Sequence, residues 1–168
     1  MVYKEVNKMK SWIKPLVKMH ACSDAVEWCE QYDSLDAAWQ ECERGDWMLW
    51  LLGRLSGPPK SESRKKLVLT ACQCARLALI YVAKGEERPL RAIETAEAWA
   101  NDDPDITLQD VRGAANAAYA ANAAYAAYAA NAANTANAAA NAAYAARMAT
   151  LKECADIVRA AYDSPKLG

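Results

Sequence analysis

The residues best suited to chemistry lie close together in the first third of the chain. Asp46, Trp47, Trp50 and Arg54 fall within about two turns of a helix. Trp47 and Trp50 share one helix face, and Arg54 lies one turn beyond Trp50. An aromatic pair beside a guanidinium can stack on a planar ring or bind an anionic group. The alternative interpretation is that Asp46 only caps a helix and both tryptophans only pack in a core.

A second group of residues carries opposite charges on neighbouring segments. Arg76 interrupts an otherwise apolar helix face between Cys72 and Ile80. A buried arginine needs an anionic partner, and Glu94 or Glu97 of the next segment would serve. The two glutamates, one turn apart, could in principle do acid–base work. No nucleophile, oxyanion device or glycine-rich phosphate loop accompanies them, so we expect a structural ion pair.

The cysteines and the single histidine form no recognisable metal or catalytic motif. Cys72 and Cys74 are separated by one residue, whereas zinc knuckles and redox motifs use a two-residue spacer. On a helix these two side chains face different directions and cannot easily hold one ion. His20 is the only histidine, which removes most triad chemistry. We therefore expect no metal, no cofactor and no catalytic residue.

The composition narrows the classes of partner. A chain of 168 residues suits one domain with a real core. The formal net charge of -1 predicts no general attraction to nucleic acid. No apolar run reaches the roughly 18 residues of a membrane span, and the N-terminus lacks the apolar stretch of a secretory signal. The sequence predicts a cytoplasmic protein with reduced thiols and with neither a nucleic-acid nor a membrane partner.

The periodicity and the boundary residues predict an all-α fold. Ser34 and Asp46 are expected N-caps, Gly45 is expected to end the helix before Asp46, and Gly57-Pro58-Pro59 is the clearest loop. Thr107 and Asp110 resemble a capping box. The expected helices cover residues 23–32, 35–43 and 47–52, a long helix that begins at Ser61 or Ser63 and ends near Ala83, a segment starting near Pro89, and the region from 108 onward.

Alanine dominates the chain from Asn116 to Arg147, where Asn or Tyr interrupts it at nearly every third residue. Alanine is the best helix former, so this segment is predicted to be helical. An unbroken helix from Leu108 to Tyr162 would be ~80 Å long, whereas a compact domain of this size is about 40 Å across. We expect a compact multi-helix domain in which this long C-terminal helix breaks near Asn131–Asn137. The alternative is a rod that pairs with another chain, and exposed alanine surface favours a homo-oligomer.

The same patterns suggest three regions within a single domain. Residues 1–20 read as a solvated basic lead-in and residues 21–104 as a helical core that contains most of the Trp and Cys residues. Residues 105–162 read as an alanine-rich helical region packed on that core.

Residues 39–51, 71–76 and 88–99 together resemble a family of all-α immunity proteins linked to bacterial polymorphic toxin systems. Members of that family also occur in phage genomes, and many continue into an alanine-rich tail interrupted by Tyr and Asp. The resemblance spans roughly Ala21 to Ala161. In this chain the tail is interrupted by Asn where the family has many Asp, which departs from the acidic surface of such tails.

The resemblance implies a non-catalytic protein that neutralises a toxin or effector by stoichiometric binding. A second hypothesis is a sequestering protein, of phage origin as the resemblance allows, that holds a nucleotide-like immune signal in a Trp- and Arg-lined pocket near a helix N-terminus. A third is a helical protein that self-assembles through its alanine surface. The candidate binding residues in the shared segments are Asp46, Trp47, Trp50, Arg54, Arg76, Arg88, Glu94 and Glu97.

Overall fold

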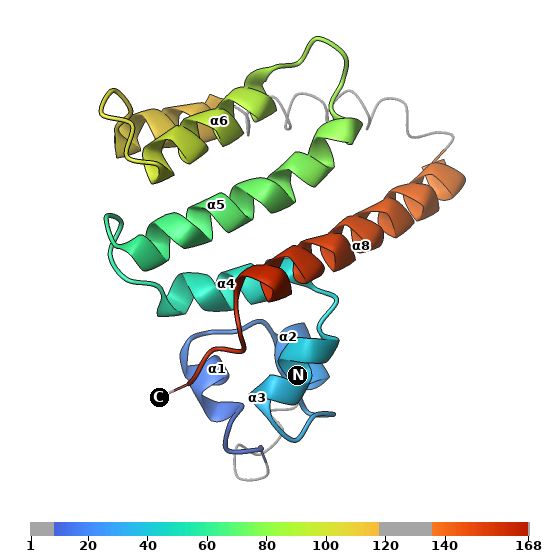
Figure 1. The fold of residues 1–168 in the computed structure, drawn as a ribbon. Helices are drawn as coiled ribbons and strands as arrows, with labels where there is room; N and C mark the ends of the chain where they lie inside the picture. The colour runs from blue at the N-terminus through green and yellow to red at the C-terminus, as the bar shows by residue number, and fades with distance from the viewer. Residues whose placement is uncertain (1–8, 118–135, 168) are drawn as a thin grey trace.

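The computed structural model describes the backbone of residues 9–117 and 136–167 and the side chains of 9–117 and 147–167. Every regular element in these ranges is helical, which confirms the predicted all-α class (Figure 1). Residues 108–117 form a further helical segment. The elements are α1 (Lys14–Lys18), α2 (Ser23–Cys29), α3 (Leu35–Glu41), α4 (Gly45–Leu55), α5 (Glu62–Leu77), the 3-10 helix η2 (Ala78–Tyr81), α6 (Arg88–Ala100) and α8 (Ala136–Ala161).

The longer helices pack side by side. Helix α5 packs between α4 and α6, and α8 runs along both α4 and α5 (Figure 1). The three short helices α1, α2 and α3 lie together beyond α4 (Figure 1). The most deeply buried apolar side chains come from α4, α5 and α8 and from these short helices. The core therefore joins the two ends of the chain, with Ile13 and Val158 both completely buried.

Several predicted helix boundaries are confirmed by their hydrogen bonds. The Ser34 hydroxyl accepts a bond from the Ala37 N–H at 3.1 Å, and the Ser61 hydroxyl accepts one from the Arg64 N–H at 3.3 Å. At Thr107 the capping box closes in both directions: the Thr107 N–H donates to Asp110 Oδ2 at 2.8 Å, and the Asp110 N–H donates to Thr107 Oγ1 at 3.3 Å. These ends could be predicted because the cap and its acceptor are close in sequence.

The prediction for the start of α4 is wrong. Gly45 does not end α3, which stops at Glu41, and Asp46 is not an N-cap. Instead Gly45 is the first residue of α4, and Arg44 occupies the cap position without a side-chain cap bond. The reason is tertiary: a Cβ at Gly45 would lie 2.4 Å from the Sγ of Cys154 on α8. The glycine allows α4 and α8 to approach this closely.

Two other boundary expectations are modified. The long helix predicted over 61–83 is α-helical only to Leu77 and then tightens into η2. The predicted solvated lead-in contributes Ile13 and Leu16 to the core, because α1 is amphipathic. The helix break was predicted near Asn131–Asn137. Asn137 lies within α8, and positions 131–135 are outside the described residues. No helix in the described ranges is long and apolar enough to cross a membrane.

Candidate functional site

The start of α4 carries a stacked and ion-paired arginine. Arg44 donates two hydrogen bonds to Asp46, from Nε to Oδ1 at 2.8 Å and from a terminal nitrogen to Oδ2 at 2.7 Å. The same guanidinium lies over the Trp47 ring, 4.2 Å from its centroid. Burial by itself raises the pKa of Asp46. The hydrogen bonds and charge of Arg44 and the hydrogen bonds from backbone N–H groups outweigh this effect, so the pKa of Asp46 lies below its ordinary value. Asp46 is therefore an ionised partner of Arg44.

One turn further along α4, a second arginine stacks on a second tryptophan. The Arg54 guanidinium lies 5.5 Å from the centroid of the Trp50 ring, a cation–π distance. Unlike Arg44, Arg54 forms no ion pair with any carboxylate of the described residues. The predicted cluster of Trp47, Trp50 and Arg54 is thus brought together, and its one free positive charge is on Arg54.

Both tryptophans line an apolar cavity of about 60 Å³ between α4 and the short helices. Trp28 of α2 and Trp39 of α3 complete a wall of four indoles, and Leu16 of α1 also lines the cavity. The Trp28 and Trp47 rings meet edge to face with centroids 5.9 Å apart, a favourable aromatic geometry. Such a wall can bury an apolar group, but it offers almost no hydrogen-bonding atoms.

The cavity has a buried floor and a more exposed mouth. Ala38, Trp39 and Met48 at the floor are only 2–3% exposed. Six lining residues are partly exposed and form its mouth: Ala21, Ala25, Trp28, Leu35, Trp47 and Trp50. Arg44 and Arg54 lie over two of them, Trp47 and Trp50.

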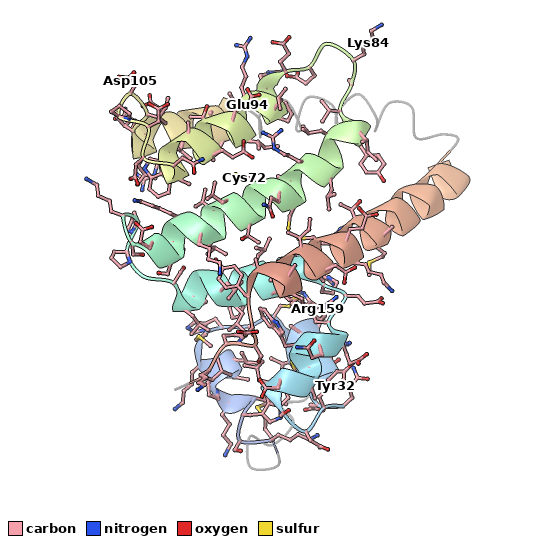
Figure 2. The ribbon with its side chains drawn as sticks, in the orientation of Figure 1. Tyr32, Cys72, Lys84, Glu94, Asp105 and Arg159 are labelled. Carbon is pink, nitrogen blue, oxygen red and sulfur yellow. The ribbon has the colours of Figure 1, made fainter. Side chains whose placement is uncertain are left out.

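A cation from α8 holds the floor in place. Arg159 donates to the backbone carbonyls of Trp39 at 3.3 Å and of Cys42 at 2.6 Å, where α3 ends (Figure 2). These carbonyls have no partner inside the helix, so a guanidinium there both satisfies them and fixes the direction of α3. Position 159 was not among the predicted site residues, because its partners are more than a hundred positions away in sequence.

The remaining predicted site residues lie on the other side of the fold, at α5 and α6. Arg76 donates to Glu97 from Nε at 2.9 Å and from a terminal nitrogen at 2.6 Å, which confirms the predicted pairing with one of the two glutamates. The prediction that Arg76 is buried is wrong, since its side chain is 42% exposed. Glu94 is exposed on α6, and its negative charge contributes to the raised pKa of Arg76 (Figure 2).

Arg88 is also neutralised within the chain. It donates to both carboxylate oxygens of Glu86, and these bonds lower the pKa of Glu86 to about 2. Arg88 was a candidate from the sequence and Glu86 was not, although two opposite charges two residues apart at a helix start could have indicated the ion pair. The predicted residues therefore form two separate groups, and only the group on α4 borders the cavity.

Five of the six cysteine side chains are buried. No cluster of three or more potential ligands occurs within the described part of the chain. Cys72 lies on α5 facing α6, where its thiol donates to the Ile93 carbonyl at 3.8 Å (Figure 2). Burial, followed by the charge of Glu97, raises the pKa of Cys72 to about 11. Of the six cysteines only Cys22 is exposed.

Comparisons with protein-family models, with curated proteins and with solved structures find no match to this chain.

Proposed function

We propose that this chain is a non-catalytic binding protein that neutralises a toxin or effector by forming a stoichiometric complex. The observation that supports the proposal best is the open, indole-walled cavity with a free guanidinium beside its mouth. Tryptophan and arginine dominate the energetic centres of protein interfaces, particularly where an apolar pocket is available to receive a partner side chain. The sequence resemblance to immunity proteins is consistent with this function.

The state of the charged residues supports binding over catalysis. Asp46, Arg76, Arg88 and Glu97 each have an ionic partner within the chain. A general base near neutral pH needs a raised carboxyl pKa, whereas the pKa values of Asp46 and Glu97 are lowered. These carboxylates are suited to holding helices together rather than to moving protons.

The proposal is tested by coexpression with each toxin encoded near the gene. We expect one toxin to be neutralised and to co-purify with the chain at a fixed ratio. A catalytically inactive form of the same toxin should bind equally well, because binding alone is required. Protection at a small fraction of the toxin's molar amount would contradict the proposal, since that result requires turnover.

Sequestration of a nucleotide-like ligand is the second function to test. Arg54 favours it, because an unpaired guanidinium can bind phosphate. The cavity does not favour it, because ligand pockets usually measure about 300–1,000 Å³ and this one measures about 60 Å³. Native mass spectrometry of the protein from its own host separates the two. A bound mass of nucleotide size that disappears in Arg54→Ala would support sequestration.

Self-assembly through alanine surface remains a prediction from the sequence. The segment that motivates it falls largely on residues 118–146, whose side chains lie outside the described part of the chain. Light scattering after size-exclusion chromatography would report the number of subunits directly.

A further inference from the structure

We propose that the cavity receives one aliphatic side chain of a protein partner and that Arg54 pairs with a carboxylate close to that side chain. This inference rests on the proposed function and identifies the chemistry of the contact. It commits to a protein partner because of three observations: the size of the cavity, the position of its mouth and the charges around that mouth.

The size of the cavity selects a side chain. A cavity of about 150 Å³ is large enough for benzene, whereas this one measures about 60 Å³. A planar base, an aromatic ring or a long aliphatic side chain is therefore too large, and a short aliphatic group such as the side chain of Val fits. A free metabolite of that size would gain little affinity from so few atoms. An aliphatic side chain attached to a partner protein gains the rest of its affinity from surrounding contacts.

The mouth of the cavity allows such a side chain to enter without rearrangement of the core. Ala21 and Ala25 line the cavity and are partly exposed, as are Trp47 and Trp50 of α4. A side chain inserted there would contact the Met48 floor, and its backbone would remain at the surface.

The charges beside the mouth select an acidic neighbour. Each tryptophan at the mouth carries a stacked guanidinium, Arg44 on Trp47 and Arg54 on Trp50. Asp46 neutralises Arg44 through two hydrogen bonds, while Arg54 has no such carboxylate within the described ranges. A partner carboxylate near the inserted side chain would complete the second pair. Stacking on the indole limits the rotation of the guanidinium, so less side-chain freedom is lost on binding.

The test uses the full chain, held by a terminal tag, and a phage-displayed library of random short peptides as the probe. We expect enrichment of peptides with Val, in preference to larger aliphatic and aromatic residues, and with Asp or Glu within a few positions. Synthetic copies of the enriched peptides then provide dissociation constants at low and high salt.

Three variants and two matched controls locate the contact. Ala25→Leu fills the mouth and should weaken peptide binding by at least about tenfold, the value of one lost buried aliphatic group. Ala21→Leu provides a second filling variant should the first fold poorly. Arg54→Ala should weaken binding by about three- to fivefold and remove most of its salt dependence. Ala75→Leu on the exposed face of α5 and Arg91→Ala on α6 repeat both exchanges elsewhere and should change neither quantity.

The inference is overturned if no peptide class is enriched, if the peptides bind the filled variants as well as the native chain, or if Arg54→Ala leaves affinity and salt dependence unchanged. These outcomes are distinct from failure of the proposed function. A chain that neutralises a toxin equally well with Ala25→Leu retains the function and loses the inference. Peptide binding that depends on the cavity, without neutralisation of any toxin, retains the inference and refutes the function.

Discussion

Replacing Gly45 with alanine tests the closest helix contact in the fold. The added Cβ would lie 2.4 Å from Cys154 Sγ, 2.6 Å from Cys154 Cβ and 2.7 Å from the backbone N of Ala155. The Sγ atom is the end of a side chain and could move, but the Ala155 nitrogen belongs to the backbone of α8. Helix α8 must therefore shift away from α4, which disturbs the buried residues Ala155 and Val158.

The expected cost follows from overpacking in a filled core, about 1–3 kcal/mol. Alanine regains only part of its usual advantage over glycine in helices, roughly 0.5–1 kcal/mol, because position 45 is the first residue of α4. We expect Gly45→Ala to lower the free energy of unfolding by about 2 kcal/mol, and Tm by about 4–8 °C for a chain of this size. Thermal and urea unfolding followed by circular dichroism provide both values.

The matched control is the same exchange at Gly53, in the last turn of the same helix. There the nearest atom to an added Cβ is Leu67 Cδ2, at the ordinary contact distance of 3.9 Å. Gly53→Ala should therefore stabilise the protein by about 0.5–1 kcal/mol. Opposite signs at the two glycines would support the packing argument. A neutral or stabilising effect of Gly45→Ala would refute the close approach of α4 and α8.

Three further predictions concern single groups. Iodoacetamide should modify only Cys22 in the folded protein at neutral pH, because the other five thiols are buried. At Cys29, for example, burial and the neighbouring Cys42 thiol raise the pKa to about 11. A second fast modification in the intact-mass spectrum would contradict this prediction. Glu97→Gln should slightly destabilise the protein at neutral pH, because it removes the ion pair with Arg76. Arg76 lowers the pKa of Glu97 in the folded protein, so the stabilisation by this pair is fully present above the ordinary pKa of 4.5 and disappears as pH falls through the lowered folded value. The unfolding curves of the variant and the native chain should therefore converge in acid. Ser34→Ala should cost about 1 kcal/mol through loss of the α3 cap while Ser34→Asn costs less, and equal stability of the two variants in urea would argue against the cap.

Local chemistry explains which parts of the fold could be predicted from the sequence. Ser34, Ser61 and Thr107 each bond to a backbone group only three residues away, so a short window contains the whole signal. Gly45 illustrates the opposite case. Glycine before an acidic residue favours a helix end followed by a cap, yet the reason for this glycine lies on α8, more than a hundred positions later. No local pattern contains that information.

The candidate site shows the same division. The spacing of Trp47, Trp50 and Arg54 on one helix was readable, because α4 positions all three. Trp28 and Trp39 could not be added to them from spacing, since they reach the cavity from other helices. The Arg76–Glu97 pair could be anticipated from charge, whereas the exposure of Arg76 depends on how α6 lies across α5.

The pairing of charges also changes which residues deserve to be called a site. From the sequence, Arg54 was expected beside the two tryptophans and Arg76 in an ion pair, while Arg88 was a candidate only as a position in a shared segment. In the structure Arg76 and Arg88 each form a two-bond ion pair with a glutamate, and such pairs fix α6 and its N-terminus. A guanidinium already held by a carboxylate must lose that partner before it can bind an external anion, which lowers its net gain. Arg54 incurs no such loss and lies beside an apolar cavity. Recognition of an acidic partner is therefore expected to depend on one cation and the indoles next to it.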